Sequence, residues 1–254
     1  TTRQAPQPGE DLHHRITITL EEAAFGVEKE INISRTEHCS LCQGIGCRPD
    51  SQPSQCPTCN GSGQVRRVQQ SIFGRFSNIT TCPQCRGEGR IITEPCPQCR
   101  GTGKEKRQRS ISVKIPAGVE DSSRIRLSGE GNAGARGGPS GNLYLSLSVK
   151  QHEFFTRDGD NILYELPINF AQAALGCEVE VPILESNVKL KIPAGSQTRQ
   201  VFRLKNKGIP NLYGSGRGDQ LVRLLVVTPD SLTKKQRQLF EELAKTLGSA
   251  KGAR

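Results

Sequence analysis

Eight cysteines in four identical patterns are the residues of this sequence whose types and spacing can do chemistry. The pattern C-x-x-C-x-G-x-G occurs at residues 39–46, 56–63, 82–89 and 96–103. Two thiolates in C-x-x-C spacing on a tight turn can bind one Zn²⁺, and they provide half of a tetrahedral site with Zn–S distances near ~2.3 Å. The four patterns therefore supply enough thiolates for two closed Cys₄ zinc sites.

Two glycines follow each cysteine pair at fixed positions. After the second cysteine the chain must fold back around the metal. Glycine adopts positive φ at little cost because it has no Cβ. We therefore interpret the glycines as part of the zinc-binding turn.

Redox activity and disulfide bonding are the alternatives for these cysteines. A thioredoxin-like site places one C-x-x-C at the N-terminus of a helix that follows a strand, and no such pattern is present. Disulfide scaffolds are usually rich in cysteine throughout, whereas nine of the ten cysteines here fall between residues 39 and 99. Structural zinc in a reducing compartment is the favoured interpretation.

The two remaining cysteines are predicted not to bind metal. Cys47 has no partner in C-x-x-C spacing, and we interpret it as a free thiol. Cys177 lies in the apolar segment ALGCEVEVPI and is interpreted as a small buried hydrophobic residue.

The composition favours small β-rich modules. Of the 254 residues, 33% are hydrophobic and only 4% aromatic, with 27 glycines and 15 prolines, which fits turn-rich domains better than one large aromatic core. No segment approaches the ~20 consecutive apolar residues that cross a bilayer. The sequence contains no methionine, even at position 1, so we expect a fragment or a processed product.

None of the four histidines stands in a motif with a nucleophile or paired carboxylates, so we predict no enzyme.

The sequence outside the cysteines is duplicated. Residues 113–127 resemble residues 190–204, and both segments contain KIPAG. Residues 12–33 resemble residues 162–183. The two copies are therefore expected to fold alike.

An insertion interrupts the first copy, running from near Ser34 to near Lys106, and it contains all four cysteine patterns. If the first copy folds like the second, the ends of this insertion must lie close together. That favours nested pairing of the patterns, the first with the fourth at a stem and the second with the third at a tip, over sequential pairing.

Each copy is predicted to be mainly β-structure. The segments RITITL, KEINI, RSISVKI and NLYLSLSV alternate apolar and polar residues, as half-buried strands do. TLEEAAFG and NFAQAALG predict short helices that end at glycine. The glycine-rich segments 128–141 and 206–219 are predicted to be surface loops, because neither stands between a strand and a helix as a phosphate-binding loop does.

An amphipathic helix is predicted after Pro229. Thr233 and Gln236 have capping-box spacing, and Gly248 is expected to end the helix. One apolar face is formed by Leu239, Phe240, Leu243 and Leu247. The sequence leaves two partners open for this face, the chain's own second domain and a second subunit.

Taken together, these features resemble the zinc-finger class of DnaJ-type J-domain co-chaperones. The resemblance rests on the four cysteine patterns inserted into the first of two β-rich repeats and on KIPAG in both copies, and it covers residues 11–248. It implies a mainly β fold with two tandem β-sandwich-like domains, a two-zinc module and a C-terminal dimerisation helix. The implied division is a linker at 1–11, client-binding β-domain I at 12–33 plus 107–150, the zinc-binding insert at 34–106, client-binding β-domain II at 151–228, and the helical dimerisation segment at 229–254.

The resemblance also implies residue roles and two Zn²⁺ per chain. One zinc would bind Cys39, Cys42, Cys96 and Cys99, and the other Cys56, Cys59, Cys82 and Cys85. The family binds exposed apolar segments of unfolded proteins by strand addition at the first β-domain. The matching residues here are Leu12, Ile31 and Ile33, whose alternative role is ordinary core packing.

The implied function is that of a cytoplasmic, homodimeric co-chaperone. It would prevent aggregation of unfolded clients and deliver them to a seventy-kilodalton heat-shock chaperone, with Leu239, Phe240, Leu243 and Leu247 at the dimer interface. The family's J-domain, with its His-Pro-Asp signature, is absent from this sequence, so we expect no stimulation of the partner's ATPase.

Nucleic acid is the rival partner, since the net charge is +10. The basic residues of the insertion are spread between the cysteine patterns, without a recognition helix. We therefore predict neither a nucleic-acid nor a membrane partner.

Overall fold

The computed structural model describes residues 5–71 and 74–247, which fold as two compact units. Of the described residues, the first unit comprises those within Thr1–Ile18, Val27–Ile115 and Val119–Lys150, and the second comprises those within Thr19–Gly26, Pro116–Gly118 and Gln151–Arg254. Strands make up most of the regular structure in both units, so the prediction of a mainly β chain is confirmed. The predicted division into domains stays a prediction.

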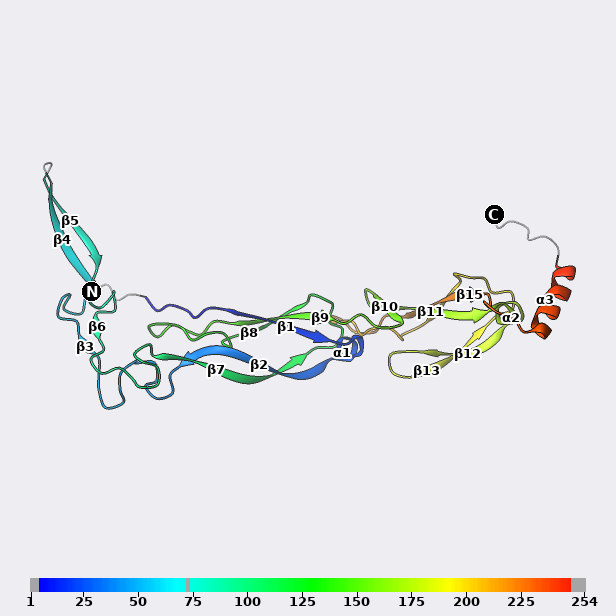
Figure 1. The fold of residues 1–254 in the computed structure, drawn as a ribbon, viewed down its shortest axis with the longest axis horizontal. Coiled ribbons are helices and arrows are strands. Elements are labelled where there is room, and N and C mark those ends of the chain that lie inside the picture. The colour runs from blue at the N-terminus through cyan, green and yellow to red at the C-terminus, as the bar shows by residue number, and fades with distance from the viewer. Residues whose placement is uncertain (1–4, 72–73, 248–254) are drawn as a thin grey trace. The chain divides into compact units, whose positions relative to one another are not determined.

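The first unit contains two β layers (Figure 1). One layer has the strand order β1-β9-β8, with β1 parallel to β9 and β8 antiparallel to it. The other is the antiparallel ribbon of β2 and β7. The bounds are β1 Leu12–Ile18, β9 Leu143–Val149, β8 Arg124–Leu127, β2 Val27–His38 and β7 Lys104–Ile115. Alternate residues such as Ile16, Ile31 and Leu145 are buried, as the period of two predicts.

The β2–β7 ribbon carries the inserted cysteine patterns. Its pairing is continuous from Val27 opposite Ile115 to His38 opposite Lys104, so the two ends of the insertion lie side by side. Within the insertion, β3 (Ser54–Gln55) pairs with β6 (Arg90–Ile91), and β4 (Gln64–Ser71) pairs with β5 (Gly74–Thr81). The ribbon is therefore the element that positions both cysteine groups.

The second unit contains a four-stranded sheet in the order β10-β11-β15-β14 and the β12–β13 hairpin. The bounds are β10 Phe155–Asp158, β11 Asn161–Asn169, β15 Gln220–Val227, β14 Val201–Leu204, β12 Cys177–Pro182 and β13 Asn187–Ile192. Its core includes Ile168, Val181, Ile192 and Leu224, and Cys177 packs against this cluster but is only half-buried. The packing contact agrees with the interpretation of Cys177, and its burial is less complete than predicted.

The two short helices of this unit, α1 (Leu20–Phe25) and α2 (Phe170–Leu175), begin and end alike. Their N-caps, Thr19 and Asn169, each form a capping box with the third helical residue. Gly26 and Gly176 follow the helices with φ of 77° and 78°. The duplicated sequence thus repeats the same local signals in both copies.

The glycine-rich segments also share their backbone hydrogen bonds. In the first copy, the amide of Asn132 donates to Glu10 O (3.0 Å) and that of Leu12 to Asn142 O (2.8 Å). In the second copy, the amide of Ile209 donates to Asp160 O (2.8 Å) and that of Ile162 to Asp219 O (3.0 Å). Each segment therefore holds the chain that enters the first long strand of its copy.

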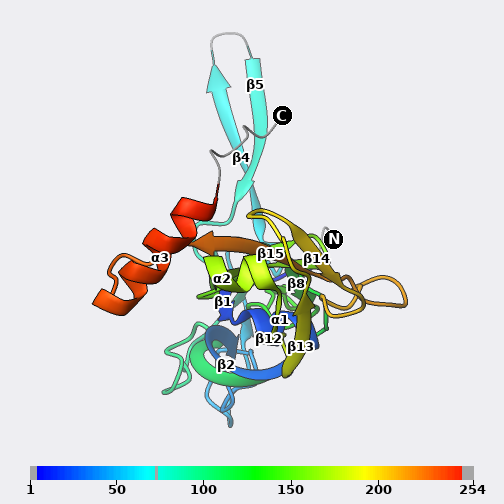
Figure 2. The same cartoon turned by 90° about the vertical axis from the view of Figure 1, so that its right-hand side faces the viewer.

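The predicted C-terminal helix is α3 (Lys234–Thr246), which lies beside α2 (Figure 2). Thr233 and Gln236 form the predicted capping box. The helix ends at Thr246, and Leu247 is its C-cap in an extended conformation, so Leu247 follows the helix. Gly248, predicted to end the helix, lies outside the described residues. Among the residues that the structure describes, no helix is long and apolar enough to cross a membrane.

Candidate metal centres

Two groups of four buried cysteines lie at the end of the β2–β7 ribbon. The stem group is Cys39, Cys42, Cys96 and Cys99, and the tip group is Cys56, Cys59, Cys82 and Cys85. Within each group the four sulfurs lie within 4.8 Å of one another. The structure thus brings together the first pattern with the fourth and the second with the third.

The distances between the sulfurs fit a tetrahedral metal. A tetrahedron with Zn–S near ~2.3 Å places its sulfurs about 3.8 Å apart. In the stem group, Sγ of Cys39 and Cys96 are 3.9 Å apart, and Sγ of Cys42 and Cys99 are 3.6 Å apart. The corresponding distances in the tip group are 3.8 and 3.6 Å. Each group can therefore hold one zinc ion, and two per chain is the stoichiometry that the geometry supports.

The second glycine of each pattern donates its amide to a sulfur. The amides of Gly46, Gly63, Gly89 and Gly103 lie 3.2–3.3 Å from Sγ of the second cysteine in the same pattern. These donors stabilise negative charge on the sulfur, as a thiolate ligand requires. The glycines therefore serve the metal site electrostatically as well as conformationally.

The same glycines lie against the partner pattern. A Cβ on Gly103 would lie 2.4 Å from Gly44 O, and one on Gly46 would lie 2.6 Å from Gly101 O. In the tip group, a Cβ on Gly63 would lie 2.5 Å from Gly87 O, and one on Gly89 would lie 2.3 Å from Gly61 O. Only glycine lets the two patterns approach this closely. The spacing of the glycines predicts the turn, whereas this contact depends on a second pattern distant in sequence.

Backbone hydrogen bonds join the paired patterns reciprocally. In the stem group, the amide of Cys39 donates to Gly103 O and that of Cys96 to Gly46 O, both at 2.9 Å. In the tip group, the amide of Cys56 donates to Gly89 O and that of Cys82 to Gly63 O, again at 2.9 Å. The pairing is therefore fixed by main-chain contacts in addition to the cysteines.

Burial and local donors act in opposite directions on the thiol pKa values. Burial raises the pKa of Cys42 and Cys56 to about 11. In Cys59 and Cys99 burial also acts upward, but the Gly63 or Gly103 amide and the neighbouring sulfurs together outweigh it, and the pKa falls to about 7. Because zinc binds thiolates, binding displaces protons and weakens as the pH falls.

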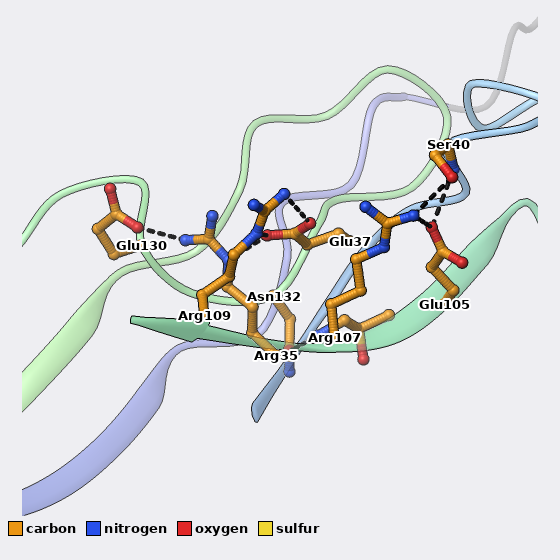
Figure 3. A network of polar contacts seen from close by, with 9 residues as sticks. Arg35, Glu37, Ser40, Glu105, Arg107, Arg109, Glu130 and Asn132 are labelled. Atoms are coloured by element: carbon orange, nitrogen blue, oxygen red, sulfur yellow. Dashed lines mark hydrogen bonds and ion pairs between the residues drawn. The ribbon is translucent and has the colours of Figure 1, made fainter. Parts of the chain in front are cut away.

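A polar network ties the ribbon near the stem group to the glycine-rich loop (Figure 3). Glu37 accepts hydrogen bonds from Arg35 (2.8 Å) and Arg109 (2.7 Å), and Arg35 also forms an ion pair with Glu130. The amide of Thr36 donates to Asn132 Oδ1 at 2.8 Å. The network holds the loop against β2, two to four residues before Cys39. Apart from Arg35 and Glu37, its partners are 72–96 residues apart in sequence, so no local pattern could have predicted them.

Glu37→Gln is expected to destabilise the first unit by about 1.5–3 kcal/mol at neutral pH, since hydrogen bonds to charged groups contribute this much. The hydrogen bond from Arg109, assisted by Arg35, lowers the pKa of Glu37 from 4.5 to about 2. A lowered folded-state pKa adds stability above pH 4.5 that is lost as the pH falls from 4.5 towards 2. The difference in thermal midpoint between wild type and variant should therefore shrink below pH 4.5. Glu88→Gln, at an exposed carboxylate, is the control, and a pH-independent difference would refute the assignment.

Gly103→Ala is expected to loosen the stem group more than Gly129→Ala. The two glycines have similar φ, 70° and 78°, so both substitutions carry the left-handed strain of about 1–2 kcal/mol. Only Gly103 meets a backbone oxygen at 2.4 Å, whereas a Cβ on Gly129 meets nothing within 4 Å. Zinc release to a chelating dye should therefore be faster in Gly103→Ala. Equal release rates would show that the close approach does not matter.

The residues predicted to line the client site lie in two strands of the first unit. Leu12 begins β1 and is half-buried, whereas Ile31 and Ile33 of β2 are buried. The burial of the two isoleucines agrees with their alternative role in the core, and the client role stays a prediction. Cys47 is buried and forms an isolated β-bridge with Pro95.

The predicted apolar face of α3 is open to solvent. Leu239, Phe240, Leu243 and Leu247 are 39–56% exposed, and no described residue of α3 is buried. Phe240 makes an aromatic contact with Phe170 of its own unit, with 6.4 Å between the ring centroids. The chain's own second unit therefore covers the face only in part.

The fold and the paired Cys₄ groups agree with the comparisons to known proteins. Residues 12–229 match the model of the DnaJ C terminal domain. The chain is 56% identical over 96% of its length to "Chaperone protein DnaJ" of Geobacillus kaustophilus, and 52% identical over 97% to the protein of the same name from Ruminiclostridium cellulolyticum. A third relative of that name, from Halalkalibacterium halodurans, is 48% identical over 96%.

The chain belongs to the DnaJ C-terminal domain family. It spans just under two thirds of these relatives, 64%, 65% and 66% of their lengths. The relatives are named as chaperones, and the two Cys₄ groups match the zinc-binding capacity expected of the family. The absence of catalytic activity, of a nucleic-acid partner and of a membrane partner stays a prediction.

Proposed function

We propose that this chain binds exposed apolar segments of unfolded proteins, prevents their aggregation and delivers them to a seventy-kilodalton heat-shock chaperone. The observation that carries the proposal is a free strand edge in the first unit of a chaperone-family chain. Among the described residues, β2 pairs only with β7, and β1 pairs only with β9. On its other side each strand has no strand partner among these residues, and the glycine-rich loop occupies the β2 edge at Thr36, whose carbonyl accepts from the amide of Ala133 at 2.7 Å.

An unpaired edge can accept an extended peptide as a further strand. Main-chain hydrogen bonds then provide affinity, and pockets for alternate side chains provide selectivity. Leu12 stands half-buried at the start of β1, and its position supports a role as an apolar contact at this edge. Lys29 of β2 donates from Nζ to Thr17 O of β1 at 3.3 Å, which bridges the two edge strands.

Binding of a labelled apolar peptide tests strand addition without changing the protein. We expect the peptide to bind the intact chain, and a copy N-methylated at alternate residues to bind at least about tenfold more weakly, because it lacks donors for the edge. The same peptide N-methylated at the intervening positions is the matched control. Equal affinity of all three peptides would refute strand addition, and failure of the chain to slow aggregation of a denatured protein would refute the chaperone role.

The proposal includes a homodimer formed through α3. The support for it is the exposed apolar face of Leu239, Phe240, Leu243 and Leu247. A second copy would place two client sites on one particle, which increases avidity for a client that offers two apolar segments. Transfer of a labelled client from the dimer to the heat-shock chaperone, followed by native electrophoresis, tests the delivery step.

A further inference from the structure

A basic surface lies on the outer face of the β1-β9-β8 sheet. We call it the basic face and define it by His13 and Arg15 of β1, Tyr144 and Ser146 of β9, and Arg124 and Arg126 of β8. The register sets these residues in two rows. His13, Tyr144 and Arg126 stand opposite one another in one row, and Arg15, Ser146 and Arg124 in the other.

The cationic groups of this face are exposed and largely without partners. Among the described residues, the guanidinium groups of Arg15 and Arg124 form no ion pair or hydrogen bond, and Arg126 reaches only Asn142 Oδ1, at 3.4 Å. Two acidic groups lie beside the face: Asp121 interacts electrostatically with Arg15 and accepts a hydrogen bond from the amide of Val149, and Asp11 accepts from Asn142, the partner of Arg126. Among the described residues, neither of them forms an ion pair with an arginine of this face, so the face keeps a net positive charge.

The second copy of the repeat folds without such a surface. At the position of Arg15 it has Glu165, which forms an ion pair with Arg223 at 3.6 Å. At the position of Arg126 it has Arg203, which pairs with Asp219. At the position of Arg124 it has Val201. The same fold thus forms with ion-paired or apolar residues at these positions. The fold of the first copy therefore does not require arginines without ion-pair partners there.

The spacing of the two rows matches an extended chain with acidic residues at alternate positions. Residues two apart in a strand lie about 7 Å apart, which is the separation of the rows. Alternate side chains of an extended peptide point to the same side and repeat at about the same distance. Strands β1 and β8 are separated by β9 and so lie about 10 Å apart, and arginines from both sides can reach one carboxylate above the middle strand.

We propose that the basic face binds acidic, extended segments of client polypeptides. The identity of the ligand as a client rests on the function proposed above, and the face is separate from the strand edges that would take apolar segments. Charge-assisted hydrogen bonds from Arg15 and Arg124 hold one carboxylate, and Arg126 with His13 holds the next. A client with an acidic stretch beside an apolar segment thus contacts the first unit twice.

A polypeptide fits this face better than a single-stranded nucleic acid. Nucleic-acid surfaces of this kind use free aromatic rings on which bases stack. The ring of Tyr144 already stacks on His13, with centroids 5.3 Å apart and planes inclined by 16°. One aromatic ring with an occupied face leaves little room for base stacking, whereas carboxylates need only the cations.

Fluorescence anisotropy with the intact chain tests the proposal. The probe is a labelled peptide of alternating glutamate and threonine, and its neutral counterpart alternates glutamine and threonine. We expect the glutamate peptide to bind more tightly and to weaken as salt is added, because exposed charges are screened. The variant Arg15→Gln/Arg124→Gln/Arg126→Gln should lose at least tenfold in affinity for it, about 1.4 kcal/mol.

The matched control is Glu165→Gln/Arg223→Gln on the equivalent face of the second copy, which should bind the glutamate peptide as wild type does. Should the triple glutamine variant misfold, by thermal unfolding or zinc content, the triple lysine variant and the salt dependence of wild type decide instead. The lysine variant keeps the charge and should bind within a fewfold of wild type.

Three results would overturn the proposal. They are equal affinity for the two peptides, unchanged affinity in the triple glutamine variant, and tighter binding of a single-stranded oligouridine that the same variant abolishes. The apolar peptide is measured in parallel with the same variants. If the wild-type chain binds the glutamate peptide but not the apolar peptide, the proposed chaperone function is refuted and the proposal for the basic face is retained.

Discussion

Elemental analysis of the reduced chain is expected to give two Zn²⁺, and single Cys→Ser replacements in either group are expected to give one. Removing one thiolate opens a Cys₄ site, and structural zinc contributes on the order of 10–16 kcal/mol of binding free energy. The sulfurs of each group lie within 4.8 Å of one another, so each replacement should affect its own group. Cys47→Ser and Cys177→Ser are the controls and should retain both ions.

Double replacements separate nested from sequential pairing. Cys39→Ser/Cys96→Ser changes one group under nested pairing and should retain one zinc, whereas Cys39→Ser/Cys59→Ser changes both and should retain none. Sequential pairing requires the reverse outcome. The same zinc measurement on the two double variants therefore decides the topology of the module.

Truncation after Pro229 is expected to convert a homodimer into a folded, zinc-loaded monomer. The four apolar residues of the α3 segment are 39–56% exposed in the single chain, and fully burying one such side chain contributes about 1.5–3 kcal/mol. A second copy can bury what Phe170 leaves uncovered. Light scattering before and after truncation measures the change.

Point substitutions on α3 test whether the apolar face, rather than another part of the helix, forms the dimer. Leu239→Ser/Leu243→Ser should give monomers, and Glu241→Gln on the same helix should leave the dimer intact. An intact chain that is monomeric at micromolar concentration, or a truncated chain that stays dimeric, would contradict the assignment of α3.

The features that could be predicted from the sequence are those that local chemistry determines. The C-x-x-C-x-G-x-G pattern specifies a turn with two thiolates, and capping boxes at Thr19, Asn169 and Thr233 specify where helices begin. The duplication also predicted one long-range feature, that the two ends of the insertion lie close together. The continuous pairing of β2 with β7 confirms this prediction.

The features that could not be predicted depend on partners from distant segments. Glu130 meets Arg35 only because the glycine-rich loop folds back on β2, and neither residue stands in a motif. The contact of Gly103 with Gly44 likewise requires both patterns in place. The basic face could not be predicted because its arginines alternate with apolar residues on separate strands, and only the register brings the rows together.

The nested order of the two cysteine groups has a consequence for how the module folds. Closing a loop costs conformational entropy that grows with the length of the free chain. The tip group joins cysteines that are nearer in sequence, so its loop is the cheaper one to close. Once it has closed, the free chain between the two halves of the stem group is shorter, and stem closure costs less. Zinc is therefore expected to bind the tip group first and the stem group second, because closing the tip lowers the entropic cost of closing the stem.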